Sequence, residues 1–143
     1  MTTDKVLLVD DEVEFVEALA ERMRARGLDA DCTYSGDDAI TRVAAKGYDA
    51  IVLDLAMPGM DGMETLRHLL SDHPDLQVIL LTGQGTIQLA VEATKLGARD
   101  FLEKPTDVEQ LIGKIRAARA KRTQLAERRT AEEINDILSR RGW

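Results

Sequence analysis

The sequence predicts a doubly wound α/β fold, in which a five-stranded parallel sheet is covered by helices on both faces. Apolar runs of strand length alternate with segments of helical periodicity, and several of these runs are continuous rather than alternating. A continuous apolar run is typical of a strand that is buried on both faces. The short connections between the two kinds of segment favour right-handed crossovers within one sheet. A chain of 143 residues with 44% apolar side chains has room for one such domain and a tail.

Five short apolar runs are the predicted strands. In chain order they are Val6–Val9, Ala30–Thr33, Ala50–Leu55, Val78–Leu81 and Asp100–Leu102. Because the carboxyl ends of parallel strands meet at one edge of a sheet, the polar residues that end these runs are expected to lie together.

Four helices are predicted between the strands, over Glu12–Arg26, Asp37–Ala45, Met63–Leu70 and Thr86–Leu96. In the first, Phe15, Val16, Leu19 and Met23 fall on one face, and Gly27 ends the helix. Gly97 is expected to end the fourth. A fifth helix is expected to begin near Thr106 or Asp107, either of which can cap it. Its predicted buried stripe consists of Leu111, Ile112, Ile115 and Ala118.

The tail differs from the rest of the chain. Residues 119–129 favour a helix but have almost no apolar stripe, so they are expected to project into solvent. The residues Thr130-Ala131-Glu132-Glu133 fit a capping box that would begin a new helix, with Ile134, Ile137 and Leu138 on one face. This face could fold back on its own domain, form a homodimer or dock to another protein. We therefore expect a globular domain over residues 1–120 and a helical extension or linker over 121–143.

Composition excludes several classes of protein. The net charge of −7 is uneven: residues 1–112 carry 10 basic and 22 acidic side chains, and residues 113–143 carry 9 and 4. The acidic body argues against direct nucleic-acid binding, and the residues after the fifth helix are too few for a helix-turn-helix domain. The single cysteine, Cys32, and two histidines supply neither a disulfide nor a zinc site. No segment has the pattern of a signal peptide or membrane helix, so a cytoplasmic location without membrane insertion is expected.

Polar residues at the predicted carboxyl edge point to phosphoryl chemistry. Asp10 and Asp11 follow the first strand, Asp54 ends the third, Thr82 follows the fourth and Lys104 follows the fifth. Three neighbouring carboxylates repel one another unless a divalent cation lies among them, and Mg²⁺ suits such oxygen ligands. With a cation and a lysine to neutralise a phosphoryl group, one carboxylate could attack phosphorus in line.

The segments around these residues resemble the CheY-like receiver domains of bacterial two-component response regulators. They are Val9-Asp10-Asp11-Glu12, Leu53-Asp54-Leu55-Ala56-Met57-Pro58-Gly59-Met60-Asp61-Gly62, Leu81-Thr82-Gly83 and Phe101-Leu102-Glu103-Lys104-Pro105. The resemblance covers about residues 4–120 and implies a flavodoxin-like sheet of order 2-1-3-4-5 with five helices. The loop Thr82-Gly83-Gln84-Gly85 further resembles that of the NtrC-type enhancer-binding subgroup.

The resemblance also implies a role for each site residue. Asp54 would be the phosphoacceptor, taking a phosphoryl group from a sensor histidine kinase. Asp11, Asp54 and the backbone carbonyl of Ala56 would bind Mg²⁺, for which Mn²⁺ can substitute, and Asp10 would act through a water molecule. Lys104 and Thr82 would contact the phosphoryl oxygens, while Thr82 and Phe101 would form the switch.

Such a protein is a phosphoacceptor switch rather than an enzyme, although it assists its own phosphorylation and dephosphorylation. Its output would be contact with a protein or output domain that the sequence does not identify.

Three other classes of protein are alternatives. A haloacid-dehalogenase-like phosphatase would carry its nucleophile in an Asp-x-Asp pattern at the end of the first strand and would need a cap domain, and neither is expected here. A flavodoxin-like cofactor binder would need a phosphate loop where Asp10-Asp11-Glu12 stands. A degenerate receiver, which is never phosphorylated, is the nearest alternative. Taken singly, Asp10 could be a helix cap, and Phe101 could simply fill the core.

Overall fold

The structure is a computed structural model that describes residues 4–55, 57, 62–83, 87–104 and 107–140. Its five strands are β1 (Lys5–Val9), β2 (Asp29–Thr33), β3 (Ala50–Asp54), β4 (Val78–Thr82) and β5 (Asp100–Glu103). All pair in parallel, in the order β2-β1-β3-β4-β5. The helices are α1 (Val13–Ala25), α2 (Gly36–Ala45), α3 (Gly62–Asp72), α4 (Ile87–Leu96) and α5 (Val108–Arg140). The predicted fold class and strand order are confirmed.

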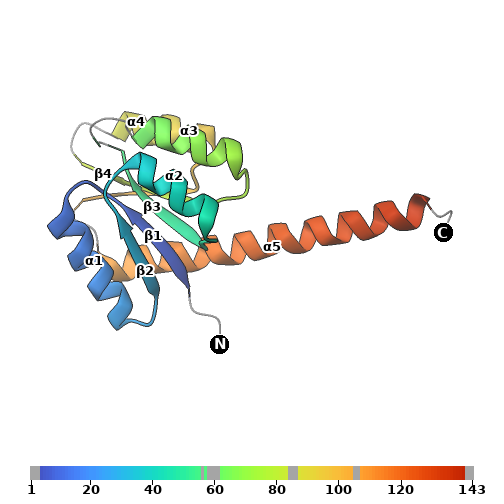
Figure 1. Ribbon diagram of the computed structural model, residues 1–143, viewed down its shortest axis with the longest axis horizontal. Coiled ribbons are helices and arrows are strands. Elements are labelled where there is room, and N and C mark those ends of the chain that lie inside the picture. Colours follow the sequence, from blue (N-terminus) through green and yellow to red (C-terminus); the bar gives the residue numbers. More distant parts are fainter. Residues whose placement is uncertain (1–3, 56, 58–61, 84–86, 105–106, 141–143) are drawn as a thin grey trace.

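The helices divide between the two faces of the sheet. Helices α1 and α5 lie on one face, and α2, α3 and α4 lie on the other (Figure 1). Each face has its own apolar cluster: Leu53 on β3 packs toward α2, α3 and α4, whereas Val52 packs toward α1 and α5. Every residue of β3 and β4 is buried, which explains why their sequences are continuously apolar.

Local signals end and begin the helices as expected. Gly27 and Gly97 take positive φ values of 89° and 121°, so the chain reverses after α1 and α4 at residues without a Cβ atom. The Asp107 side chain accepts a hydrogen bond of 2.9 Å from the Glu109 amide and thereby caps α5. Thr106, the other predicted cap, lies outside the described residues.

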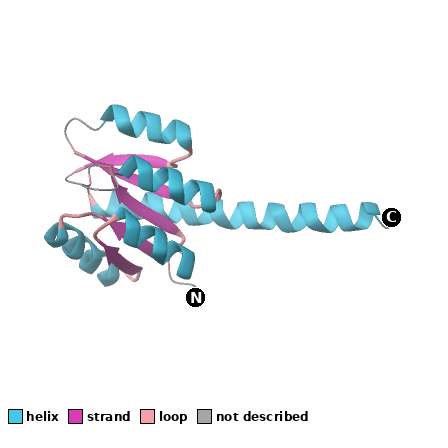
Figure 2. Ribbon diagram, turned by 45° about the horizontal axis from the view of Figure 1, so that its top comes forward, coloured by secondary structure: helices cyan, strands magenta, loops and turns pink. Residues whose placement is uncertain are grey.

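The predicted capping box at Thr130 is wrong. Helix α5 continues without a break from Val108 to Arg140, and the Thr130 hydroxyl donates to the Ala126 carbonyl one turn earlier in the same helix. A threonine inside a helix can make this bond instead of capping, so the motif alone does not end a helix. The helix extends well beyond the body of the domain in both ribbon views (Figure 2).

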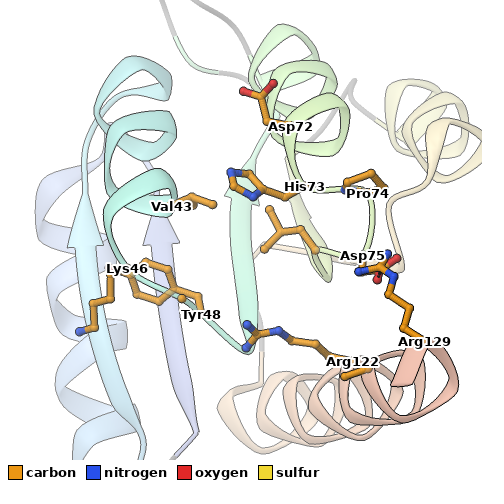
Figure 3. Close-up of a pocket in the computed structure, with 12 residues that line it drawn as sticks. Val43, Lys46, Tyr48, Asp72, His73, Pro74, Asp75, Arg122 and Arg129 are labelled. Atoms are coloured by element: carbon orange, nitrogen blue, oxygen red, sulfur yellow. Dashed lines mark ion pairs between the residues drawn. The ribbon is translucent and has the colours of Figure 1, made fainter. Parts of the chain in front are cut away.

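The first part of this extension is attached to the body, contrary to the expectation that it projects freely. Arg122 pairs with Asp49 at 3.2 Å, and Arg129 forms an ion pair with Asp75. Figure 3 shows both arginines reaching from α5 toward the connections before β3 and β4, where they line a pocket of about 380 Å³ together with Tyr48. Arg122 and Leu125 are accordingly half-buried.

In the part of the chain that the structure describes, no helix combines the length and apolar character needed to cross a membrane.

Candidate functional site

The candidate site lies at the carboxyl edge of the sheet, where the ends of four strands meet. Asp54 and Thr82 are the last residues of β3 and β4, while Asp10 and Lys104 directly follow β1 and β5. Strand register brings these ends together: Asp54 pairs with Leu81, and Thr82 with Glu103. The Lys104 amide also donates to the Thr82 carbonyl at 2.7 Å. The fold therefore gathers residues that are up to 94 positions apart in the sequence.

Three carboxylates form a compact acidic cluster. One carboxylate oxygen from each of Asp10, Asp11 and Asp54 lies within 4.8 Å of the others. Asp10 and Asp54 are only 1% and 4% exposed, while Asp11 is the most accessible of the three. Groups with like charges this close cannot all ionise cheaply without a cation.

Lys104 supplies a positive charge beside this cluster. Its ammonium nitrogen lies 2.7 Å from Asp10 Oδ2 and 3.7 Å from Asp54 Oδ2, and 3.3 Å from Glu12 Oε1. Burial lowers the pKa of Lys104, but the neighbouring carboxylates more than offset this effect, so its pKa lies above the ordinary value. The side chain is therefore charged at neutral pH.

The cluster fits a hard divalent cation. Its donors are carboxylate oxygens, which Mg²⁺ and Ca²⁺ prefer. Asp10 Oδ2 is buried and, among the described residues, has no partner with hydrogen-bond geometry; its close contact with Lys104 is an ion pair. A buried oxygen with spare acceptor capacity at the centre of the cluster is suited to bind a cation or its water. The predicted ligand Ala56 lies outside the described residues.

Asp10 has a second, structural task. Its Oδ1 accepts a hydrogen bond of 2.9 Å from the Glu12 amide at the start of α1, and its own amide donates to the Thr33 carbonyl of β2. The helix-cap interpretation of Asp10 is wrong, because the N-cap residue of α1 is Glu12 and the Asp10 bond closes a turn just before the helix. These bonds fix the orientation in which Oδ2 faces Lys104.

The start of α3 approaches the end of β3 very closely. A Cβ atom on Gly62 would lie 2.4 Å from Leu55 Cα and 2.6 Å from the Asp54 carbonyl oxygen. The Gly62 amide also donates to the Leu55 carbonyl at 3.3 Å. Helix α3 can thus begin directly against the end of β3 only because residue 62 has no side chain.

Phe101 lies in the strand predicted for it, whereas Thr82, predicted to follow the fourth strand, is the last residue of β4. Thr82 is fully buried, and its hydroxyl donates to the Leu102 carbonyl of β5 at 3.4 Å. Phe101 is half-buried and packs against the cluster that lies under α2, α3 and α4. The switch roles of Thr82 and Phe101 remain a prediction.

Two site residues were not predicted. Glu12 was predicted only to begin the first helix, yet its carboxylate contacts the Lys104 ammonium. Phe15 was assigned to the core face of α1, but its ring centroid lies 4.7 Å from the same ammonium, a cation–π distance. The sequence did offer a signal for these two contacts. It has an acidic residue and an aromatic residue, three positions apart, directly after Asp10-Asp11.

Comparisons with known proteins agree with this geometry. Residues 6–116 match the family described as the response regulator receiver domain. The C4-dicarboxylate transport transcriptional regulatory protein DctD of Rhizobium meliloti (strain 1021) is 34% identical over 134 residues, which are 94% of this chain and 29% of DctD. The response regulator MprA of Mycobacterium ulcerans (strain Agy99) is 32% identical over 130 residues, which are 91% of this chain and 56% of MprA.

Solved structures give the same result. The crystal structure of the receiver domain of NtrX from Brucella abortus superposes with a TM-score of 0.76 at 31% identity, covering 80% of this chain and 98% of that one. Similar proteins thus include NtrC-type regulators such as DctD and NtrX, at modest identity. This chain spans 29% and 56% of the lengths of DctD and MprA.

Proposed function

The chain belongs to the response regulator receiver family, and on this premise we propose that it accepts a phosphoryl group on Asp54 from a sensor histidine kinase. The observation that carries the proposal is the cluster of Asp10, Asp11 and Asp54 with Lys104 at its edge. A receiver is a phosphoacceptor signalling module rather than an enzyme in the usual sense. Its chemistry is nevertheless that of an in-line phosphoryl transfer.

In this reaction an Asp54 carboxylate oxygen attacks phosphorus, and the bond from phosphorus to the histidine nitrogen breaks. The imidazole leaves with the electron pair, and Asp54 carries an acyl phosphate. Lys104, which lies 3.7 Å from Asp54 Oδ2, neutralises negative charge on the transferred group. The Thr82 hydroxyl exchanges its bond to the Leu102 carbonyl for one to a phosphoryl oxygen. The same groups assist hydrolysis, in which water replaces Asp54 on phosphorus.

We assign Mg²⁺ to the acidic cluster, with Mn²⁺ as a substitute. Asp11 and Asp54 would bind it directly together with the Ala56 carbonyl, and Asp10 through a water molecule. When bound, the cation supplies charge neutralisation for the phosphoryl oxygens as they approach the three carboxylates. The chain's own contribution is to hold Asp10 rigidly through its bonds to Glu12 and Thr33.

Phosphorylation would then shift the balance between two packings of the domain. Movement of Thr82 toward the phosphoryl group vacates space that Phe101, already half-buried beside the core, enters. The surface formed by α4, β5 and α5 changes, and an output protein or output domain recognises the change. This chain makes no direct nucleic-acid contact in the proposal, because its body is strongly acidic.

The test is the intact mass of the chain after incubation with acetyl phosphate, with and without Mg²⁺. We expect a Mg²⁺-dependent gain of one phosphoryl group. Asp54→Asn should abolish this gain, and Asp11→Asn should make it independent of Mg²⁺ or undetectable. Asp37→Asn, which removes an exposed carboxylate at the start of α2, is the matched control and keeps normal labelling. Labelling of the Asp54→Asn variant would contradict the assignment of the acceptor. Failure of the wild-type chain to be labelled would instead favour a degenerate receiver.

A further inference from the structure

The Lys104 side chain leaves the sheet on the face that α1 covers. Successive residues of a strand point to opposite faces of a sheet, and Phe101 and Leu102 of β5 accordingly pack against different apolar clusters. Leu102 packs toward α1 and α5, so Lys104, two positions further along, starts from the same face. The Lys104 amide continues the strand ladder by donating to the Thr82 carbonyl at 2.7 Å. The backbone thus directs the lysine toward α1.

Phe15 meets this lysine from the first turn of α1. Because α1 follows β1 after only three residues, its first turn lies beside the carboxyl edge of the sheet. Phe15 is half-buried and, like Leu102 and Val108, packs against the apolar cluster under α1 and α5. Its ring centroid lies 4.7 Å from the Lys104 ammonium nitrogen, with the ammonium over the ring. The ring therefore connects the apolar core to the charged site.

The position of the Lys104 ammonium needs such support. A lysine carries its charge at the end of a flexible four-carbon stem, and an error of about 1 Å in the placement of a reacting group can slow a reaction about a hundredfold. Within the described residues, three carboxylates and the Phe15 ring surround this ammonium. Of the carboxylates, that of Glu12 is 63% exposed, so water weakens its attraction.

The ring differs from the carboxylates in how it responds to a bound cation. Carboxylates that bind a divalent cation attract the ammonium less, and the cation itself repels the ammonium. The attraction between the ammonium and the ring arises from the ring's quadrupole, and it does not depend on the charge of the carboxylates. The contact with Phe15 therefore persists in the loaded site, in which the ion pairs of Lys104 are weakened.

We propose that Phe15 is a positioning residue for phosphoryl transfer, an inference that rests on the function proposed above. Its ring holds the Lys104 ammonium at the edge of the acidic cluster, both with and without Mg²⁺, so that the charge is in place when the phosphoryl group arrives. Phe15 acts through Lys104 and not on the reacting atoms. A leucine at this position would fill apolar space but would offer no aromatic face to the ammonium.

Nuclear magnetic resonance tests the contact without any phosphorylation. Protons above an aromatic ring are shielded, so the Lys104 Cε protons, assigned by their loss in Lys104→Met, should resonate upfield of those of an exposed lysine. The upfield shift should persist in saturating Mg²⁺, disappear in Phe15→Leu and survive in Phe15→Tyr. Val16→Ala, which removes buried apolar volume from α1, is the control and should leave the shift unchanged. An ordinary shift in the wild-type chain, or loss of the upfield shift when Mg²⁺ binds, overturns the proposal.

The rate of labelling by acetyl phosphate in saturating Mg²⁺ tests the role. Phe15→Leu should slow labelling by about fivefold, the effect of losing one cation–π contact, and Phe15→Tyr should label at nearly the wild-type rate. In a Lys104→Met background, which labels poorly, Phe15→Leu should cause no further slowing. Equal slowing in both backgrounds would mean that Phe15 only packs the core, and it would overturn the proposal, as would normal labelling of Phe15→Leu. A wild-type chain that is not labelled at all contradicts the proposed function instead, and the resonance of Lys104 then decides whether Phe15 holds the ammonium.

Discussion

The Lys104 ammonium lies within 4 Å of the carboxylates of Asp10, Glu12 and Asp54. When no divalent cation is bound, the positive charge of Lys104 offsets the repulsion among the carboxylates of the acidic cluster. Removing one member of a largely buried ion pair leaves the other charges uncompensated, at a cost of about 3 kcal/mol. We therefore expect Lys104→Met to lower the free energy of unfolding by about that amount in metal-free buffer, measured by urea denaturation.

The loss should shrink in saturating Mg²⁺, because the bound cation takes over the charge balance and binds the folded state more tightly than the unfolded chain. Lys114→Met is a suitable control: Lys114 pairs with Asp100 at a more exposed position. Its removal should cost less than about 1 kcal/mol, with or without Mg²⁺. An equal loss for Lys104→Met in both buffers would argue against the cation and the lysine sharing one site.

The ionisation of Tyr48, which lies outside the candidate functional site, tests the structure at high pH. Burial of its ring and its hydrogen bond to Asp31 raise the pKa of Tyr48 to about 12 from an ordinary value of 10. A raised pKa means that the folded state favours the protonated phenol. This contribution is complete below pH 10 and disappears as the pH rises through 12. Absorbance titration of a Tyr34→Phe variant, in which Tyr48 is the remaining tyrosine, should show the late ionisation.

Tyr48→Phe should correspondingly be less stable than the parent at neutral pH by about 1 kcal/mol, because Asp31 loses a hydrogen bond. The difference between the two proteins should narrow between pH 10 and pH 12. A constant difference across this range would mean that the phenol is not held in its protonated form by the fold.

The junction of β3 and α3 depends on the missing side chain of Gly62. A Cβ atom there would overlap backbone atoms of Asp54 and Leu55, which cannot move aside without displacing the end of β3. We expect Gly62→Ala to cost about 2 kcal/mol or more in thermal or urea unfolding, and to weaken Mg²⁺ binding through displacement of Asp54.

Gly113→Ala is the matched control for the same change in a different element. A Cβ atom at Gly113 on α5 would meet no atom within 4 Å, and the residue has no positive φ. Alanine should therefore stabilise the helix by about 0.5–1 kcal/mol. Similar losses at Gly62 and Gly113 would contradict the close approach seen after β3.

The elements of the sheet could be predicted from sequence because burial on both faces imposes a continuous apolar pattern. The predicted strands differ from the observed ones by one residue at an end, and Gly27 and Gly97 end the helices where expected. Helix α5 was harder to predict, since no residue between Ala118 and Arg140 is fully buried and able to impose a period. The helix stays continuous because of the helix propensity of its residues and because Arg122 and Arg129 form ion pairs with the body. Ion pairs with residues far away in the sequence leave no pattern in the local sequence.

The acidic cluster was predictable for a different reason. Parallel strands place Asp10, Asp11 and Asp54 at one edge whatever the details of packing, so order along the chain was enough. Contacts across that edge were not predictable, because they depend on side-chain reach. Glu12 and Phe15 meet Lys104 across 92 and 89 positions of sequence, and no local pattern specifies the close approach of Gly62 to Leu55.

The boundary of the independently stable part of the molecule falls within α5 rather than at its end. The last buried residue of this helix is Ala118, and beyond it the body holds the helix by exposed ion pairs, each worth about 1 kcal/mol or less. We expect a chain that ends at Ala120 to keep its fold and Mg²⁺ binding, with a free energy of unfolding within about 2 kcal/mol of the full chain. Loss of folding on this truncation would contradict a domain of residues 1–120.

Amide hydrogen exchange should locate the same boundary without truncation. A single helix that leaves a protein body has little stability of its own, so its amides exchange through local fraying. Amides of Ile112, Ile115 and Ala118 should exchange only with global unfolding, whereas amides beyond Arg129 should exchange orders of magnitude faster. Equal protection of these two groups of amides would mean that the body stabilises the whole helix.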